Sequence, residues 1–408
     1  MSRWWFVAAV AAVAGCGGPD PIGAWPAALV VRSAGTQTGL IGYPVNVPPA
    51  VRLLDADGKP ISGAPITFTV TSGGGVVTGG VATTGSDGVA TVGSWAIGAG
   101  NNTLRASIPA PFRVDPVAFS ANGVGQSYKI DLLYISGPPT PRQQAVFDNA
   151  AARWQLLIYG DVPDIPGVSL PPGSCLGNEP AINQNIDDVL IFVTLDSIDG
   201  PGNILGGATP CFVRFTTFAP LIGAMVFDTA DLAELDSLGA FDEVILHEMG
   251  HVLGFGTIWQ PLNLLTGPAS AGGTDPHFVG PQALAAFDRI GGGSYTAGLK
   301  VPVEDSGGPG TADAHWRERT FGNELMTGYL DVGANPLSVL TVASLGDEAY
   351  QVNYAAADPY THAFHVAPLP GAPAAPPGGR RISLAHDILR VPIRIVDRRG
   401  KVIGVFHH

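Results

Sequence analysis

The sequence is poor in charged residues, in cysteine and in long apolar runs. Only 13% of its 408 residues are charged, and 34 acidic residues outnumber 21 basic ones, giving a formal net charge of −13. This acidic balance leaves no basic surface for nucleic acid. Because Gly (55) and Pro (36) are abundant, we expect a soluble, loop-rich chain. The length predicts two or three domains.

The N-terminus carries a short apolar run, Trp4 to Val13. It falls far below the roughly 20 apolar residues of a membrane span, so residues 1–16 are predicted to be an export signal, and no other segment is a credible span. The end of this signal, Val13-Ala14-Gly15-Cys16, resembles a bacterial lipobox, and residues 17–26 resemble a tether. We therefore expect Cys16 to be lipidated and the protein to be anchored at the cell envelope, at the outer membrane or cell surface. An ordinary secretory signal with a stray Cys is the alternative.

Two further cysteines, Cys175 and Cys211, remain after Cys16 is set aside. Exported proteins meet an oxidising compartment, where an even pair of cysteines favours a disulfide. Both cysteines are expected between strands, and neither has the spacing of a Cys zinc site. Two free thiols are the alternative.

Residues 27–124 have an all-β pattern of short apolar runs separated by Gly, Pro and Asp turns. The stretches 55–68 and 87–92 resemble those of bacterial Ig-like domains of adhesins and surface enzymes. The Asp55 stretch is interpreted as a turn, because Lys59 and Ile66 break the pattern of a calcium-binding loop. The sequence thus predicts an Ig-like β-sandwich that serves as a spacer or docking module.

The segment His247-Glu248-Met249-Gly250-His251 carries the clearest chemistry in the chain. Residues four apart share one face of an α-helix, so His247 and His251 can hold one zinc ion, with Glu248 beside them as a general base for a zinc-bound water. Chance produces about 0.004 such matches in a chain of this composition. The acids Asp242 and Glu243 suit the start of this helix.

A catalytic zinc site takes a third protein ligand. The short motif of metzincins places it six residues after the second His, and that position is Thr257. The third ligand must therefore come from further along the chain. The candidates are His277, His315, His362 and His365, or an acid such as Glu304 or Glu318.

The segments His315-Trp316 and Asn323-Glu324-Leu325-Met326-Thr327-Gly328 resemble leishmanolysin, a metalloprotease family of the metzincin clan. The resemblance implies that His315 is the third zinc ligand and that Met326 forms the apolar floor of a Met-turn. It also implies that residues 255–314 are an insertion. It covers His247 to about Tyr354 and implies a metalloprotease domain over residues 125–367. The protozoan members carry a pro-segment whose Cys masks the zinc, and no such pro-segment is recognisable here.

Several elements of this domain can be predicted. Residues 129–135, 189–193 and 223–227 are expected to be strands, and 141–159 a helix with Thr140 as its N-cap. The metzincin resemblance makes the strand at 223–227 the sheet edge that binds an extended peptide. Residues 368–379 resemble a Pro/Gly linker. Residues 380–408 are expected to form a basic, β-hairpin-like tail, which would dock on the acidic body or contact an anionic surface.

The sequence therefore predicts a multidomain protein, an all-β Ig-like sandwich followed by an α+β metzincin-type zinc protease domain. The expected activity is zinc-dependent hydrolysis of peptide bonds in protein or peptide substrates, with Glu248 as general base. The alternative is a non-catalytic surface lipoprotein or adhesin that binds through its Ig-like domain. Specificity and oligomeric state are not predicted.

Overall fold

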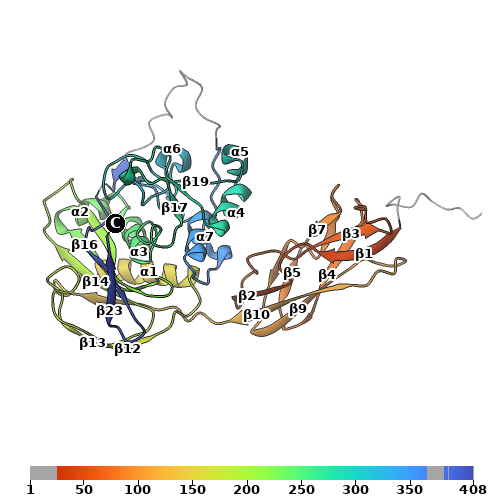
Figure 1. Ribbon diagram of the computed structural model, residues 1–408, viewed down its shortest axis with the longest axis horizontal. Helices are drawn as coiled ribbons and strands as arrows, with labels where there is room; N and C mark the ends of the chain where they lie inside the picture. Colours follow the sequence, from red (N-terminus) through yellow and green to blue (C-terminus); the bar gives the residue numbers. More distant parts are fainter. Residues whose placement is uncertain (1–24, 365–380, 385, 408) are drawn as a thin grey trace, which may run out of the picture. The chain divides into compact units, whose positions relative to one another are not determined.

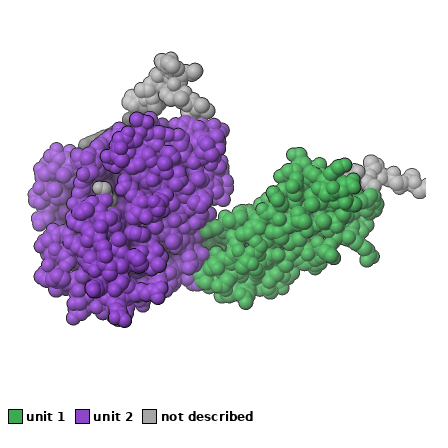
Figure 2. All heavy atoms as spheres, viewed as in Figure 1, with its two compact units in different colours: residues 1–124 green, residues 125–408 purple. Residues whose placement is uncertain are grey.

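The computed structural model describes residues 25–364, 381–384 and 386–407. The chain divides into two compact units, residues 1–124 and 125–408 (Figures 1 and 2). Both contain several sheets, and the chain is mostly β with some helices. The predicted signal at 1–16 with Cys16, the tether up to residue 24 and the linker at 368–379 lie outside the described residues.

The first unit has two main sheets around one core. A three-stranded sheet has the order β1-β3-β7, and a five-stranded sheet has the order β2-β10-β9-β4-β6. Apolar side chains of both sheets are buried together, among them Leu53 from the first and Phe68 and Leu104 from the second. The strands are β1 (Pro26–Val31), β2 (Thr36–Leu40), β3 (Ala50–Asp55), β4 (Pro65–Ser72), β5 (Val76–Thr78), β6 (Val81–Thr83), β7 (Val89–Thr91), β8 (Ser94–Ala96), β9 (Gly100–Ser107) and β10 (Val117–Val124).

The Asp55 stretch forms the predicted turn. Asp55 Oδ1 accepts hydrogen bonds from the backbone N–H groups of Asp57 (3.0 Å) and Lys59 (2.8 Å). The carboxylate thus satisfies the backbone donors of its own loop, as Asp commonly does in turns.

The second unit is built on a six-stranded sheet of order β11-β14-β16-β15-β22-β23. The neighbours β11, β14 and β16 run parallel, β15 is antiparallel to β16, and β22 is parallel to β15. The strand predicted as the sheet edge, β16, is therefore interior, because β15 and the C-terminal strands extend the sheet beyond it. The bounds are β11 (Ile130–Tyr134), β14 (Val189–Asp196), β15 (Gly206–Arg214), β16 (Pro220–Asp228), β22 (Ile393–Val396) and β23 (Val402–Phe406).

Helices α1 (Pro141–Leu157) and α3 (Phe241–Val252) pack together beside this sheet (Figure 1). Helix α1 begins as predicted: Thr140 and Gln143 form a capping box, and Pro141 takes the first position. Trp154 of α1 is fully buried and donates its indole N–H to the carbonyl of Leu246 in α3 (2.9 Å). This contact fixes α3 against α1.

The remaining elements of the unit are short. Residues 255–314 form a loop-rich layer with a small sheet of order β17-β18-β19. The remaining bounds are β12 (Ile165–Leu170), β13 (Ile182–Ile186), α2 (Thr229–Ser237), β17 (Leu265–Thr266), η1 (Ala269–Ala271), β18 (His277–Phe278), α4 (Pro281–Arg289), α5 (Gly293–Thr296), β19 (Val301–Pro302), α6 (Glu318–Phe321), β20 (Tyr329–Asp331), α7 (Val339–Asp347), η2 (Tyr354–Ala356) and β21 (Arg381–Ser383).

The C-terminal tail packs on this unit. Its strand β21 pairs antiparallel with β20, β22 pairs with β15, and β22 and β23 form an antiparallel hairpin. Arg381 makes ion pairs with Glu318 (2.9 Å) and Asp331 (3.0 Å). The tail therefore docks on acidic side chains of the unit. In the described part of the chain, no helix has the length and apolarity needed to cross a membrane.

The two remaining cysteines are buried close together. Cys175 lies in the loop between β12 and β13, whereas Cys211 lies within β15, not between strands as expected. Their Cα atoms are 5.5 Å apart, a separation that a disulfide spans. A bond here closes a loop across 36 positions of the sequence.

We predict that Cys175 and Cys211 form a disulfide in exported protein. Replacing both with Ala should lower the free energy of unfolding by about 2–4 kcal/mol, because the unfolded chain loses a loop constraint. Urea denaturation of variant and unsubstituted protein under oxidising conditions measures this difference. Peptide mapping without reductant that recovers both thiols free would contradict the prediction.

Candidate metal centre

Helix α3 positions three of the predicted site residues on one surface. It runs from Phe241 to Val252 with Asp242 and Glu243 in its first turn, where negative charge suits the helix dipole. His247, Glu248 and His251 are all buried. Their spacing places both imidazoles one helical turn apart on one face.

Two glycines bring the chain back to this helix after it ends. Gly254 and Gly256 have φ values of 121° and 76°, which side chains other than glycine rarely adopt. A Cβ on Gly256 would lie 2.2 Å from the carbonyl oxygen of Ala314, the residue before His315. Gly256 therefore permits the close backbone approach that sets His315 beside the helix.

The third imidazole converges with the other two. The Nε2 atoms of His247, His251 and His315 are separated by 2.9 Å (247 to 251), 3.0 Å (251 to 315) and 3.2 Å (247 to 315). All three side chains have 0% exposure. His315 thus lies beside His247 and His251 of α3, although no short motif links it to them.

The opposite ring nitrogen of each His is held by a backbone carbonyl. Nδ1 of His247 bonds Leu325 O (2.7 Å), Nδ1 of His251 bonds Phe255 O (2.8 Å), and Nδ1 of His315 bonds Thr311 O (2.9 Å). A carbonyl only accepts, so each Nδ1 carries the proton. Each Nε2 therefore presents a lone pair to the common centre.

This donor set fits a zinc ion. Three lone pairs that face one another in a buried space repel, and protonating all three would place three imidazolium cations side by side without water. A cation at their centre resolves this, and three imidazoles are a common ligand set for catalytic zinc. Burial lowers the pKa of His247 and, more strongly, of His251, which keeps both rings neutral as metal ligands must be.

A fourth group, absent from the sequence-based prediction, joins the cluster. Asp387 Oδ2 lies 2.9 Å from Nε2 of His315, 3.3 Å from that of His247 and 3.9 Å from that of His251. Its side chain is buried, and the four residues form one potential metal-binding group. No short motif marks this residue, which stands in the basic tail 72 positions after His315.

Glu248 lies next to the cluster without ligating it. Its side chain is 1% exposed, and its Oε2 has no hydrogen-bond partner within the described residues. Burial, reinforced by the nearby carboxylate of Asp387, raises the pKa of Glu248 well above its usual range. A buried carboxyl beside a metal site is a suitable group to accept a proton and to return it.

Met326 packs below the helix at the cluster. It is fully buried, and a Cβ on Gly250 would lie 3.0 Å from its Cε, so helix and Met side chain are in close contact. The neighbouring Glu324 is also buried and accepts hydrogen bonds from Met326 N (2.7 Å) and from the hydroxyls of Ser338 and Thr341. Glu324 thereby fixes the turn that presents the Leu325 carbonyl to His247. The sequence prediction assigned it no role.

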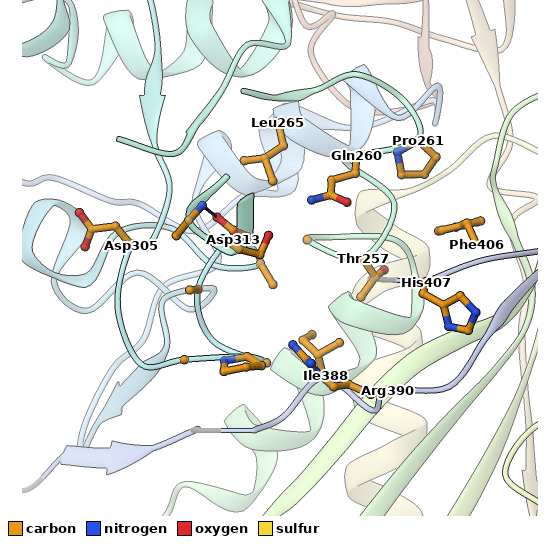
Figure 3. Close-up of a pocket in the computed structure, with 18 residues that line it drawn as sticks. Thr257, Gln260, Pro261, Leu265, Asp305, Asp313, Ile388, Arg390, Phe406 and His407 are labelled. Atoms are coloured by element: carbon orange, nitrogen blue, oxygen red, sulfur yellow. Dashed lines mark hydrogen bonds between the residues drawn. The ribbon is translucent and has the colours of Figure 1, made fainter. Parts of the chain in front are cut away.

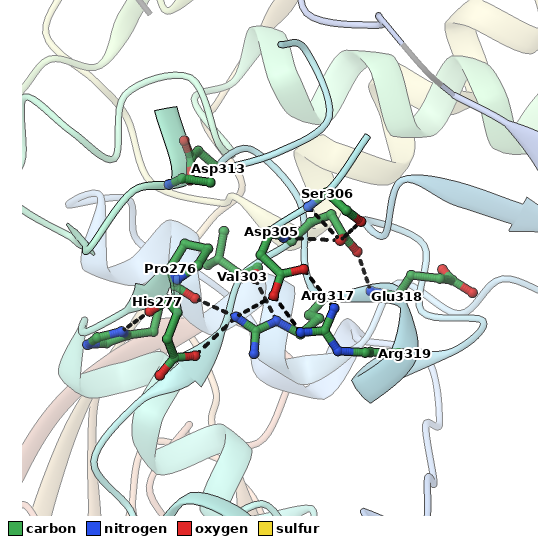
Figure 4. A network of polar contacts seen from close by, with 12 residues as sticks. Pro276, His277, Val303, Asp305, Ser306, Asp313, Arg317, Glu318 and Arg319 are labelled. Carbon is green, nitrogen blue, oxygen red and sulfur yellow. Dashed lines mark hydrogen bonds and ion pairs between the residues drawn. The ribbon is translucent and has the colours of Figure 1, made fainter. Parts of the chain in front are cut away.

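Polar contacts fix the chain after His315 (Figure 4). Arg317 donates to the carbonyls of Val303 (2.9 Å) and Pro276 (3.1 Å), and Arg319 pairs with Asp305. These contacts tie the segment that follows His315 to the insertion at 255–314.

The other proposed third ligands lie elsewhere. Both Glu304 oxygens accept hydrogen bonds from backbone N–H groups, from Asp305 and Ser306 on one side and from Glu318 on the other. Glu304, Glu318, His277 and His362 are not in the His-His-His-Asp group found among the described residues. His365 lies outside those residues. Thr257, at the short-motif position, donates its hydroxyl to His251 O (2.9 Å) and so caps α3.

A cavity of about 300 Å³ opens between the insertion and the tail (Figure 3). Thr257 and Gln260 line it from the loop after α3, Asp313 from the chain before His315, and Ile388 and Arg390 from the tail. Ala314 and Ile388 are direct neighbours of His315 and Asp387 in the sequence. The cavity therefore adjoins the metal cluster.

Comparison with known proteins identifies similarity over the middle of the chain. The model of the leishmanolysin family matches residues 182–366. Leishmanolysin of Leishmania donovani is 30% identical over 178 residues, 42% of this chain and 28% of that protein. The leishmanolysin homolog of Crithidia fasciculata is 29% identical over 182 residues, 43% of this chain and 26% of that protein. The chain thus spans little more than a quarter of the length of these relatives, and the match to the family model ends before Asp387.

Solved structures give weaker likenesses. The D00-D0 domain of intimin matches 22% of this chain and 45% of its own, at 17% identity and a TM-score of 0.18. A β-glucuronidase of Parabacteroides merdae matches 24% of this chain and 13% of its own, at 18% identity and a TM-score of 0.18. TM-scores this low do not indicate a shared fold or function.

We predict that Gly256→Ala strongly destabilises the second unit, because the Ala Cβ meets the backbone at Ala314. Gly272→Ala is the matched control: its φ is 84°, yet nothing lies within 4 Å of the added Cβ. The control should cost about 1–2 kcal/mol for the left-handed backbone alone. Gly256→Ala should cost clearly more in thermal or urea unfolding. Equal losses of unfolding free energy in the two variants would contradict the close packing of Gly256 against Ala314.

Proposed function

We propose that the second unit is a zinc-dependent endopeptidase of leishmanolysin type, within the metzincin clan. The observation that carries this proposal is the convergence of three buried Nε2 lone pairs beside the buried carboxyl of Glu248. The similarity of residues 182–366 to the leishmanolysin family supports it. The expected substrates are proteins or peptides.

In this proposal His247, His251 and His315 hold one zinc ion. The ion, when bound, supplies Lewis acidity that lowers the pKa of a water toward about 7 and polarises a carbonyl. Glu248 accepts a proton from the attacking water and delivers it to the leaving amine. Met326 forms an apolar floor under the ligands, and the three backbone carbonyls hold each imidazole in the ligating tautomer.

The rival hypothesis is a non-catalytic surface protein that binds a partner through its first unit. Hydrolysis of a mixed peptide library that stops when a chelator removes zinc separates the two hypotheses. The presence of Glu248 beside three convergent imidazoles favours catalysis, because a binding scaffold has no need for a buried carboxyl whose Oε2 has no hydrogen-bond partner among the described residues.

We further propose that the first unit is an Ig-like spacer or docking module and that the protein is a lipoprotein of the cell envelope. Two sheets around a shared core support the first proposal. The lipobox-like residues before Cys16 support the second.

We predict that His315→Ala weakens zinc binding by more than about 100-fold, beyond the 10–100-fold typical of losing a group that only orients a ligand. His277→Ala and His362→Ala are controls, because neither belongs to the convergent cluster. Competition with a chelator of known affinity, read by metal analysis, measures the change. Unchanged zinc affinity in His315→Ala would place the third ligand elsewhere.

We predict that Cys16→Ser moves the protein from the membrane to the soluble fraction. A lipid chain on Cys16 is the proposed anchor, and Ser cannot accept it through a thioether. Fractionation of cells expressing each form, followed by immunoblotting, gives the result. Undiminished membrane association of the Ser variant would remove the lipoprotein proposal.

A further inference from the structure

The tail segment that carries Asp387 crosses directly over the metal cluster. Upstream of this residue, β21 pairs with β20, and Leu384 N donates to Gly328 O (3.1 Å), close to Met326. Downstream, β22 pairs with Phe212–Arg214 of β15. Asp387 thus lies in the sequence between two strands that are each anchored on the unit.

The carboxylate of Asp387 faces the centre of the cluster. Its Oδ2 reaches all three Nε2 atoms within 3.9 Å, whereas Oδ1 has no hydrogen-bond partner within the described part of the chain. A buried carboxylate with so few hydrogen bonds is unfavourable unless a positive charge lies beside it. A zinc ion held by the three imidazoles supplies that charge and gains a carboxylate oxygen, one of its usual ligands.

A fourth protein ligand changes the character of a zinc site. Catalytic sites keep three protein ligands and leave the fourth position to water or substrate, whereas sites with four protein ligands are closed. The set of His247, His251, His315 and Asp387 is a closed one. With this carboxylate in place, the position that the proposed reaction requires is taken.

The backbone beside Asp387 occupies the adjacent strand edge as well. Asp387 O accepts a hydrogen bond from Ala208 N (2.7 Å), and Leu389 N donates to Ala208 O (3.1 Å), so Ile388 bridges Ala208 as a parallel strand residue. Strand β15 packs against α3, and extended peptides bind sheet edges through such backbone groups. The tail therefore occupies the N–H and C=O groups of Ala208, which a peptide substrate would need if it bound along β15.

The tail leaves part of the cleft open. The cavity of about 300 Å³ is lined by Ile388 on the tail and by Gln260 and Leu265 on the insertion (Figure 3). The segment occupies the fourth metal position and the hydrogen-bonding groups of β15, but it leaves this cavity unfilled. This is expected of an inhibitory segment more than of a segment that only completes the core.

We propose that residues 381–384 and 386–407 form a built-in inhibitor of the metal centre, with Asp387 as the zinc ligand that closes it and the segment around Ile388 as a pseudo-substrate strand on β15. This inference rests on the proposed zinc endopeptidase function. It implies that the protein exists in a latent form and becomes active when Asp387 leaves the cluster.

The test compares zinc-loaded, full-length proteins that differ at one carboxylate. Asp387→Asn removes the charged ligand at nearly constant shape. Asp397→Asn is its matched control: Asp397 lies in the same tail, where Oδ1 accepts from the backbone N–H groups of Arg399 and Lys401, and an Asn oxygen can do the same. Asp387→Ala serves as a second variant should the Asn side chain still fill the position.

Two readouts separate the inference from the function on which it rests. The first is binding of a peptide hydroxamate, a zinc-directed probe, by calorimetry, which needs no turnover. The second is hydrolysis of a peptide library, measured also in the double variant Asp387→Asn, Glu248→Ala. A closed state that dominates the population weakens apparent affinity by the fraction that is open, so we expect at least about tenfold tighter hydroxamate binding once Asp387 is replaced.

The expected result is a gain of at least about tenfold in both hydroxamate binding and hydrolysis for Asp387→Asn, no gain for Asp397→Asn, and hydroxamate binding without hydrolysis for the double variant. Equal hydroxamate binding in unsubstituted, Asn and Ala proteins would overturn the inhibitor. The inhibitor would also be overturned if both Asp387 variants lost zinc and bound no hydroxamate. That result would show that Asp387 is a structural ligand. If hydroxamate binding became tighter but no chelator-sensitive hydrolysis appeared, the closure of the metal site by Asp387 would be supported and the peptidase function would be contradicted.

Discussion

The second unit depends on one arrangement: three buried imidazoles whose Nε2 lone pairs meet at one point. Each ring is held in that tautomer by a backbone carbonyl, and the three carbonyls come from different places, the Met326 turn (Leu325), the loop after α3 (Phe255) and the chain before His315 (Thr311). The site therefore cannot form unless the insertion and the Met326 turn have both folded. Buried polar groups are costly unless satisfied, so the three ring N–H groups and these carbonyls stabilise one another.

The surrounding structure serves this convergence. Gly256 lets the backbone at Ala314 approach, and Glu324 holds the turn that carries Leu325. Arg317 ties the chain after His315 to the insertion. The tail then brings Asp387 within 2.9 Å of Nε2 of His315. The proposed latency and the proposed catalysis depend on the same property, the fourth ligand position of the zinc ion. That position can take the oxygen of a water or of a substrate, and it can equally take the carboxylate of Asp387 when the tail is paired with β15.

The sequence predicted the local elements of the site well and its long-range partners poorly. His247, Glu248 and His251 follow from helix geometry alone, and the Thr140 cap and the Asp55 turn follow from hydrogen bonding within a few residues. The convergence of His315 could be anticipated only through its resemblance to a family. Asp387 carried no signal, because its place depends on how the tail pairs with β15 and β20. The expected sheet edge, β16, is an interior strand because β15 pairs with it on the side away from β14.

The most direct test of the central claim is anomalous diffraction at the zinc absorption edge from crystals of the zinc-loaded, full-length protein. We expect one strong zinc peak within about 2.0–2.2 Å of Nε2 of His247, His251 and His315 and of a carboxylate oxygen of Asp387. A zinc ion held by fewer than these three imidazoles, or bound at another site, would contradict the metal centre. Zinc on the three imidazoles with a water in the fourth position and Asp387 turned away would contradict its closure by the tail.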